Sequence, residues 1–185
     1  MAGRILEVIA MGHPVLQEVS LAVKNPLDPD VQALIENMEA TVDHLNCSGL
    51  AAPQVGASLR LVIFRVPKTT ENPAYQLTPE YDPEGVPWTV MINPEISPLS
   101  REMTAGWEPC LSLPGLMGEV PRYHSIQYTY LNRHGQTESR TAHGFHARVV
   151  QHECDHLDGI LFPQRMTDMS TFGFKEEILK RMEAC

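Results

Sequence analysis

One short segment restricts this chain more than any other: His152-Glu153-Cys154-Asp155-His156. It falls in a predicted helix from about Ala142 to Leu157, and Gly159 is a favoured residue just past a helix end. Residues four apart lie on one helical face, so both imidazoles can reach a single ion. Glu153 is rotated about 100° from His152, which places it beside the ion rather than among its ligands. The segment therefore predicts a metal site on a helix.

The competing interpretation is that the two histidines are structural residues of an ordinary helix, because the motif is short. Phe145 and Val149 precede the histidines on the same face, so this face begins apolar and then becomes polar. Burying two histidines and Asp155 is costly unless these groups are coordinated or hydrogen-bonded, which favours the metal site. Asp155 would then orient a ligand histidine or bond to nearby backbone.

A third ligand is needed, because catalytic metal sites usually combine three protein ligands with an open position. The candidates are Cys110, Asp158, Glu176 and Glu177. The two glutamates lie roughly one helix downstream, where zinc proteases of the thermolysin type place their third ligand. A lone cysteine such as Cys110 is more often a small core residue than a ligand. Spacing alone leaves the choice between cysteine and glutamate open.

The segment Ser48–Gly56 offers a further group that could act on a substrate. Gly49 allows the backbone to approach another group closely, and Gln54 carries an amide donor. The alternative is a tight connection between a helix and a strand, with an incidental glutamine.

The whole pattern predicts an α+β fold in which short mixed or antiparallel strands pack around the central metal-motif helix. We expect an N-terminal amphipathic helix from Asp28-Pro29 to about Asn46 and a C-terminal helix at about 170–182. Strands are expected at Leu59–Val66, at Trp88–Ile92 before Asn93-Pro94, and in a hairpin of Tyr123–Leu131 with Gln136–Arg140. Residues 67–87 are expected to be irregular, and no linker divides the chain, which predicts a single catalytic domain over 1–185.

Composition excludes several classes of function. Apolar residues make up 43% of the chain and charged residues 20%, as in globular proteins. The net charge of -9 argues against direct nucleic-acid binding and against a basic membrane-binding patch. No apolar run approaches the roughly 20 residues of a membrane helix, so we expect a cytoplasmic protein. Its four cysteines, at 47, 110, 154 and 185, are then expected to be free thiols or ligands rather than disulfides.

Three segments together resemble the signature blocks of peptide deformylases, in the family's order: Gly49–Gln54, Glu108–Ser112 and His152–His156. Met11–Leu16 and Gly159–Phe162 are also similar to the family, and the resemblance spans about residues 5–170. It implies a metal-dependent hydrolase that removes the N-formyl group from the N-terminal methionine of newly made peptides and releases formate. Its substrates would be N-formylmethionyl peptides, as nascent chains near the ribosome.

The resemblance also implies the parts of the active site. Cys110, His152 and His156 would bind one divalent metal ion, usually Fe(II) in this family, with zinc, nickel or cobalt as possible occupants. Glu153 would be the catalytic acid/base. The Gln54 side chain and the Leu111 backbone N–H would stabilise the oxyanion.

For the substrate, the resemblance implies that the Gly49 backbone holds the peptide and that the methionine side chain lies near Phe145 and Val149. Arg148 stands where an aliphatic residue often lines this pocket, and we expect its stem to pack while its charged head reaches water. Two other positions depart from the family pattern. Cys47 stands where many members have glycine, and Pro109 replaces the usual glycine before Cys110, which removes a backbone donor beside the substrate.

Two rival functions follow from the alternatives. The first is a zincin-type protease that uses Glu176 or Glu177 as its third ligand. The second is a non-catalytic, metal-stabilised binding protein that kept the scaffold. The presence of Glu153 and Gln54 beside the ligands argues against the second.

Overall fold

The structure, a computed structural model, describes residues 3–68 and 85–183. Its helices are α1 (Pro29–Leu45), α2 (Gly144–Leu157) and α3 (Lys175–Glu183), with a short 3-10 helix, η2, at Ala52–Val55. Its strands are β1 (Gly49–Ala51), β2 (Leu61–Val66), β3 (Val86–Pro98), β4 (Met103–Cys110), β5 (Leu113–Tyr123), β6 (Ser125–Leu131), β7 (Thr137–His143) and β8 (Gly173–Phe174).

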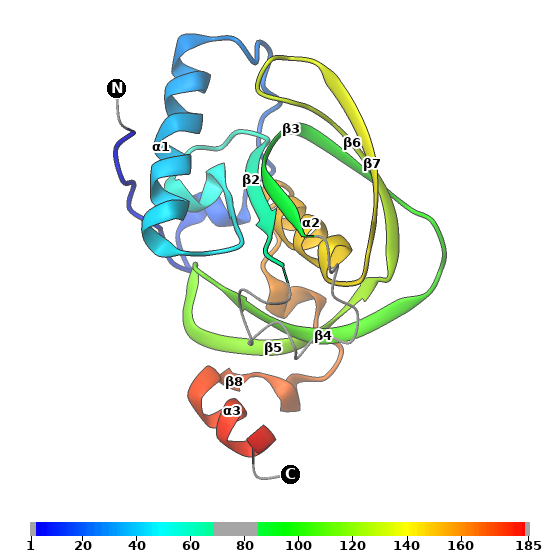
Figure 1. Cartoon of the computed structure of the whole chain (residues 1–185). Helices are drawn as coiled ribbons and strands as arrows, with labels where there is room; N and C mark the ends of the chain where they lie inside the picture. The colour runs from blue at the N-terminus through cyan, green and yellow to red at the C-terminus, as the bar shows by residue number, and fades with distance from the viewer. Residues whose placement is uncertain (1–2, 69–84, 184–185) are drawn as a thin grey trace.

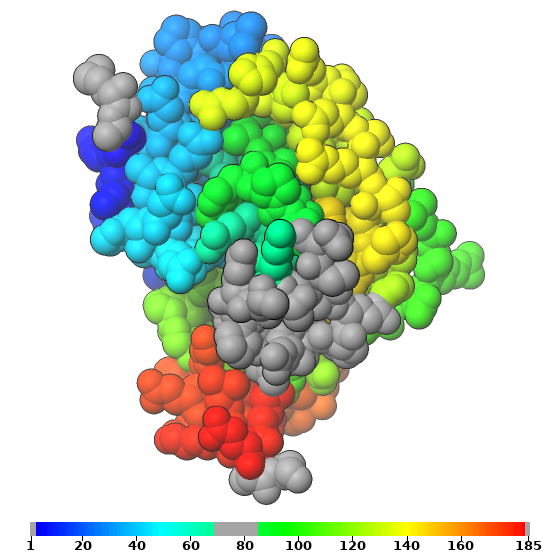
Figure 2. Space-filling model, in the orientation of Figure 1, coloured from blue at the N-terminus to red at the C-terminus, as the bar shows by residue number. Residues whose placement is uncertain are grey.

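The strands form two antiparallel sheets around one helix. The larger sheet has the order β1-β2-β3-β6-β7, and the smaller has the order β4-β5-β8. In Figure 1, α2 lies within the curve of the larger sheet, and β4 and β5 pass below it. Figure 2 shows α3 at the end of the molecule opposite α1. The predicted α+β fold with a central helix is confirmed.

Strand β2 shows how the sequence places α2 at the centre. Successive side chains of a strand point to opposite faces. Leu61 and Ile63 belong to the core beneath α1, whereas Val62 and Phe64 belong to the core around α2. All four are fully buried. The apolar run of β2 is therefore packed on both sides, and the larger sheet separates the two helices.

The boundaries of the first two helices follow from local chemistry. The Asp28 side chain accepts a hydrogen bond from the Asp30 N–H at 2.9 Å, and Asn46 ends α1 in the left-handed conformation. Gly159, with φ of 70°, lies so close to the Gln17 carbonyl that a Cβ atom there would be 2.7 Å from its oxygen. Both the turn and this contact require glycine, which confirms the predicted end of α2.

The predicted stop of a strand at Asn93-Pro94 is wrong, because β3 continues to Pro98. Its pairing with β6 shifts register between Ile92 and Glu95, and Asn93 has φ of 51°. The Asn93 side chain bonds to both the N–H and the carbonyl of Val23, at 2.9 Å each. This bulge accommodates the proline that would otherwise end the strand.

The remaining predictions concern the strands after β3, the C-terminal helix and the segment 67–87. The β6–β7 hairpin is confirmed, whereas the sequence did not predict the β4–β5 hairpin. The C-terminal helix begins at Lys175, later than the predicted 170, because β8 precedes it. The predicted irregular segment lies mostly outside the described residues, and Val86-Pro87 belong to β3.

Two expectations from composition concern the cysteines and the helices. Cys47, Cys110 and Cys154 are free, as expected, and Cys185 lies outside the described residues. Among the helices that the structure describes, none is long and apolar enough to cross a membrane.

Candidate active site

The turn between β4 and β5 meets α2 at a possible metal site. One ligand atom each from Cys110, His152 and His156 lies within 4.8 Å of the others, and all three residues are buried. Cys110 Sγ is 3.4 Å from His156 Nε2. That separation is close to the roughly 3.5 Å expected for sulfur and nitrogen around one tetrahedral ion, given bonds of about 2.3 and 2.0 Å. The residues therefore fit a divalent transition metal in both chemistry and spacing.

A buried carboxylate holds the first histidine in place. His152 Nδ1 lies 2.8 Å from Glu108 Oε2, which leaves Nε2 as the nitrogen that can bind a metal. Arg122 donates to both oxygens of Glu108, at 2.9 and 2.8 Å. Burial opposes the charge on Glu108, but Arg122 outweighs it and holds the pKa of this carboxyl well below its usual range. Glu108 is therefore an ionised acceptor for the His152 N–H.

Sequence reasoning missed this role of Glu108, and its expectation that Asp155 orients a ligand histidine or bonds to nearby backbone is wrong. Asp155 instead accepts hydrogen bonds from Arg122 and Arg165. A usable signal was present, because residues two apart in a strand share a face, and Glu108 precedes Cys110 by two. The β4–β5 hairpin had to be recognised first for that signal to be read.

Glu153 lies beside the ligands but has a different environment. Burial raises its pKa to about 7, and Glu108 adds to the rise, although His152 opposes it. Such a group can exchange a proton near neutral pH. Among the described residues, Glu153 Oε2 has no hydrogen-bond partner, as expected for an atom reserved for a bound group. Its other oxygen is so close to Gly49 that a Cβ atom there would clash with it.

Gln54 presents its amide nitrogen to the same place. Its Oε1 accepts a hydrogen bond from the Ala51 N–H at 2.9 Å, which fixes which end of the amide is oxygen. Its Nε2 then points toward Cys110 Sγ at 3.6 Å and Ser112 Oγ at 3.2 Å. Gln54 lies on the short helix η2, which follows β1 directly, and its Nε2 therefore reaches the site from the side opposite α2.

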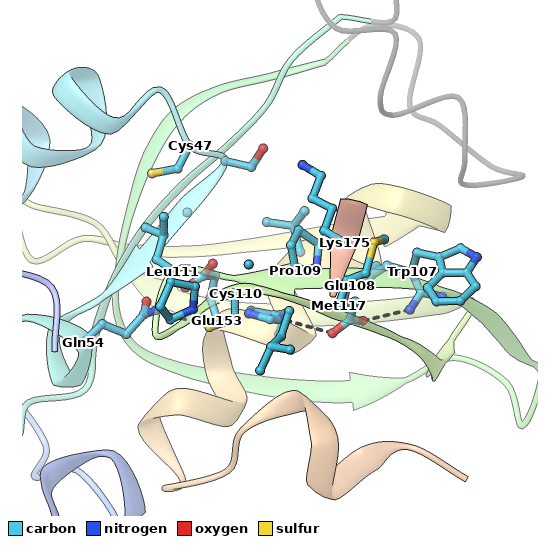
Figure 3. Close-up of a pocket in the computed structure, with 18 of the residues that line it drawn as sticks. Cys47, Gln54, Trp107, Glu108, Pro109, Cys110, Leu111, Met117, Glu153 and Lys175 are labelled. Carbon is cyan, nitrogen blue, oxygen red and sulfur yellow. Dashed lines mark hydrogen bonds and ion pairs between the residues drawn. The ribbon is translucent and has the colours of Figure 1, made fainter. Parts of the chain in front are cut away.

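These groups lie along a pocket of about 810 Å³, within the range of small-molecule sites. Figure 3 shows Cys110, Glu108 and Glu153 at its inner end, while Lys175 extends over it from α3. The lining also includes residues predicted for substrate contact or the oxyanion, namely Gly49, Leu111, Phe145 and Val149. Because His156 is placed with His152, the structure brings all of the predicted site residues together.

The structure also shows the surroundings of the three positions that depart from the family pattern, Cys47, Pro109 and Arg148. Cys47 lines the pocket, and burial raises its pKa to about 11, so its thiol is protonated at neutral pH. Pro109 lies on an edge strand where the β4–β5 register shifts, the kind of place where a sheet tolerates proline. The expectation for Arg148 is wrong: its head does not reach water but is buried and bonded to Glu108.

The other candidates for third ligand lie elsewhere. Glu177 pairs with Lys180 at 2.6 Å on the exposed side of α3, and Glu176 is exposed beside it. Asp158 pairs with Arg60 at 2.7 Å. Among the described residues, only Cys110 joins the two histidines in such a group, so the protease-like ligand set is wrong.

Comparison with known proteins agrees with this site. A family model described as polypeptide deformylase matches residues 5–172. Peptide deformylase 2 from Ralstonia nicotianae is 47% identical over 180 residues, which cover 97% of each chain. This chain belongs to the peptide deformylase family. Among solved structures, a Met-Ala-Ser-bound class I type b peptide deformylase from Acinetobacter baumannii matches with a TM-score of 0.78 and 37% identity, covering 90% of this chain and all of that one.

A second solved structure shows how far the fold extends within the family. The peptide deformylase from Ehrlichia chaffeensis has the same TM-score of 0.78 at 28% identity and covers 97% of this chain. Peptide deformylases are metalloenzymes, and Cys110, His152 and His156 supply a possible site for that metal here.

Proposed function

We propose that this protein hydrolyses the formyl group from the N-terminal methionine of newly made peptides, releasing formate and a free amino terminus. The observation that carries this proposal is the convergence of Cys110, His152 and His156 beside Glu153 at the buried end of one pocket. Membership of the peptide deformylase family supports it, as does the relative that binds Met-Ala-Ser, a peptide beginning with free methionine.

The metal is proposed to be Fe(II) in the native protein, with zinc, nickel or cobalt able to replace it. One thiolate with two imidazoles suits all of these borderline ions. When bound, such an ion lowers the pKa of water and stabilises negative charge on a carbonyl oxygen. Metal analysis of protein purified without oxygen should find about one iron per chain if the assignment is correct.

Three groups of the chain are proposed to carry out the proton and charge transfers. Glu153 takes a proton from the water that attacks the formyl carbon and returns it to the leaving amine. Gln54 Nε2 and the Leu111 N–H donate to the oxygen on which negative charge develops. Each such donor typically contributes about 3 kcal/mol to the lowering of the barrier.

The remaining residues are proposed to hold the peptide. We propose that the backbone of Gly49 bonds to the peptide, and its position next to Glu153 supports this role. The methionine side chain would lie against Phe145 and Val149, which precede His152 on the same face of α2. Such substrates are nascent chains, so we place the reaction in the cytoplasm close to the ribosome. We also propose that residues 1–185 act as a single catalytic domain.

The experiment is to incubate the metal-loaded protein with formyl-Met-Ala-Ser and to measure formate and free amino groups together. Both should appear in equal amounts, a chelator should abolish both, and added metal should restore them. Unformylated Met-Ala-Ser serves as the matched substrate control. Loaded protein that releases no formate would point to a non-catalytic binding protein, whereas cleavage of either peptide between residues would point to a protease.

A further inference from the structure

Arg148 is a buried cation whose position on α2 is one turn before His152. Its side chain is only 7% exposed, which is rare for an arginine unless its charge is satisfied. Its Nη1 donates to Glu108 Oε1 at 2.8 Å. The same nitrogen donates to the carbonyls of Val120 at 2.7 Å and Gly106 at 3.3 Å, and Nη2 donates to Thr104 at 2.6 Å. One side chain of α2 thus bonds to both strands of the β4–β5 hairpin.

Strand β4 has a space shaped for this guanidinium. A Cβ atom at Gly106 would lie 2.8 Å from Arg148 Cζ, and real Cβ atoms do not approach so closely. Gly106, Glu108 and Cys110 alternate along β4, so they share one face of the strand. All three of these residues are buried, whereas the β4 residues between them are more exposed. The face that supplies the sulfur ligand therefore also accepts Arg148.

Neutralising Glu108 does not by itself require Arg148. Arg122 already donates to both oxygens of that carboxylate. What Arg148 adds is a connection between two elements, because three of its four acceptors are backbone carbonyls of the hairpin. Cys110 stands on that hairpin, and both histidine ligands stand on α2. The spacing of the three ligands depends on how α2 docks against β4.

We propose that Arg148 is a positioning residue of the metal centre, which clamps α2 to the β4–β5 hairpin and thereby sets the distance from Cys110 to the two histidines. The proposal rests on the metal site of the proposed function. Arg148 acts through Glu108 and the backbone, since its guanidinium is engaged by these acceptors. The consequence is a slower loss of the ion than the three ligands alone would give.

The test replaces the guanidinium without emptying the space along its stem, by Arg148→Met. Co(II) is the probe, and the measurements are its rate of release to an excess of chelator and its visible absorption. We expect release about tenfold faster or more, the usual size of effects from groups that orient metal ligands. The absorption bands should also shift, because the ligand geometry around cobalt changes.

The matched control is Arg60→Met, which loosens the other end of the same helix. Arg60 Nη1 donates to Asp158 Oδ1 at 2.7 Å and to the Leu157 carbonyl at 3.3 Å, away from Glu108. It should release cobalt at the wild-type rate, even if its thermal unfolding temperature falls as far as that of Arg148→Met. Equal acceleration in both variants would overturn the proposal, because a general loosening of α2 would then explain the result.

A second variant keeps the charge and displaces it. Gly106→Ala leaves Arg148 in the chain but fills the space of its guanidinium, so it should accelerate release as Arg148→Met does, and it remains informative if Arg148→Met fails to fold. Wild-type release rates and spectra in the Arg148 and Gly106 variants would overturn the clamp while leaving the metal site intact. Wild-type protein that binds no cobalt with a sulfur ligand would refute the metal site itself, and the clamp with it.

Discussion

The two ends of the pocket hold their charges in opposite ways. At the inner end, Glu108 is 2% exposed and bonded to two arginines and a histidine. At the outer end, Lys175 is exposed, and Leu179 joins it from the next turn of α3. Buried charges with fixed partners are organised before the substrate arrives, whereas exposed charges are screened and adjust to it. We therefore expect the inner end to suit one reaction and the outer end to accept peptides of different sequence.

The largest effect that this contrast predicts is at Glu153. Glu153→Gln keeps the shape of the side chain but cannot accept and return a proton, so kcat should fall by about 10³-fold or more. Metal content, measured by elemental analysis, should stay at the wild-type level because Glu153 is not among the three grouped ligands. Near-normal kcat in this variant would remove Glu153 from its proposed role.

Gln54→Ala comes next. It removes an amide nitrogen that the Ala51 N–H holds in a fixed orientation, so kcat should fall by about 10²- to 10³-fold with a smaller change in KM. Ser112→Ala is the matched control, because Ser112 Oγ accepts from the same nitrogen without being a proposed donor. A larger loss in the serine variant than in the glutamine variant would reverse the assignment.

Gly49→Ala should lower the rate by an intermediate amount, through a displacement of Glu153 at the inner end. The added methyl group collides with the carboxyl of Glu153, and a displacement of about 1 Å in a catalytic group can cost about 10²-fold in rate. Gly173→Ala is the control, because its Cβ would meet Ile178 at an ordinary 3.6 Å. If both variants turn over substrate like the wild type, the close approach of Gly49 and Glu153 has no catalytic role.

The smallest effect is expected at the outer end. Lys175 extends over the pocket, so Lys175→Gln should lower kcat/KM by about two- to fivefold for peptides that end in a free carboxylate. C-terminally amidated peptides should show no such change, and added salt should remove the difference. Lys180→Gln, whose amine pairs with Glu177, provides a control on the same helix. An effect as large as that at Gln54 would mean that the rim is as organised as the inner end.

The sequence predicted the elements whose signals are local. The amphipathic spacing and the Asp28 cap marked α1, and the histidine spacing marked the metal face of α2. Spacing left cysteine and glutamate equally open as third ligand, and the resemblance to a family decided between them. The position of Cys110 depends on the β4–β5 hairpin, which the sequence did not predict, and on how that hairpin packs against α2, which no local pattern encodes.

The burial of Arg148 was also beyond prediction from local sequence. The sequence predicted a packed stem for Arg148 with its charged head in water, because a buried arginine is rare in the absence of partners. Its partners are one carboxylate and three carbonyls on strands that the sequence did not predict. The sequence does not show that Gly106 leaves room for a side chain, because the neighbour that needs this room, Arg148, is brought there only by the fold.

The enclosure of α2 between two sheets has a consequence for the order in which the protein is completed. Every strand of the larger sheet, and the hairpin that carries Cys110, precedes α2 in the chain. During synthesis the two histidines therefore emerge from the ribosome after most of their surroundings have been made. The possible metal site is therefore completed only when α2 has been made, and a chain truncated before α2 lacks two of its three grouped ligand residues.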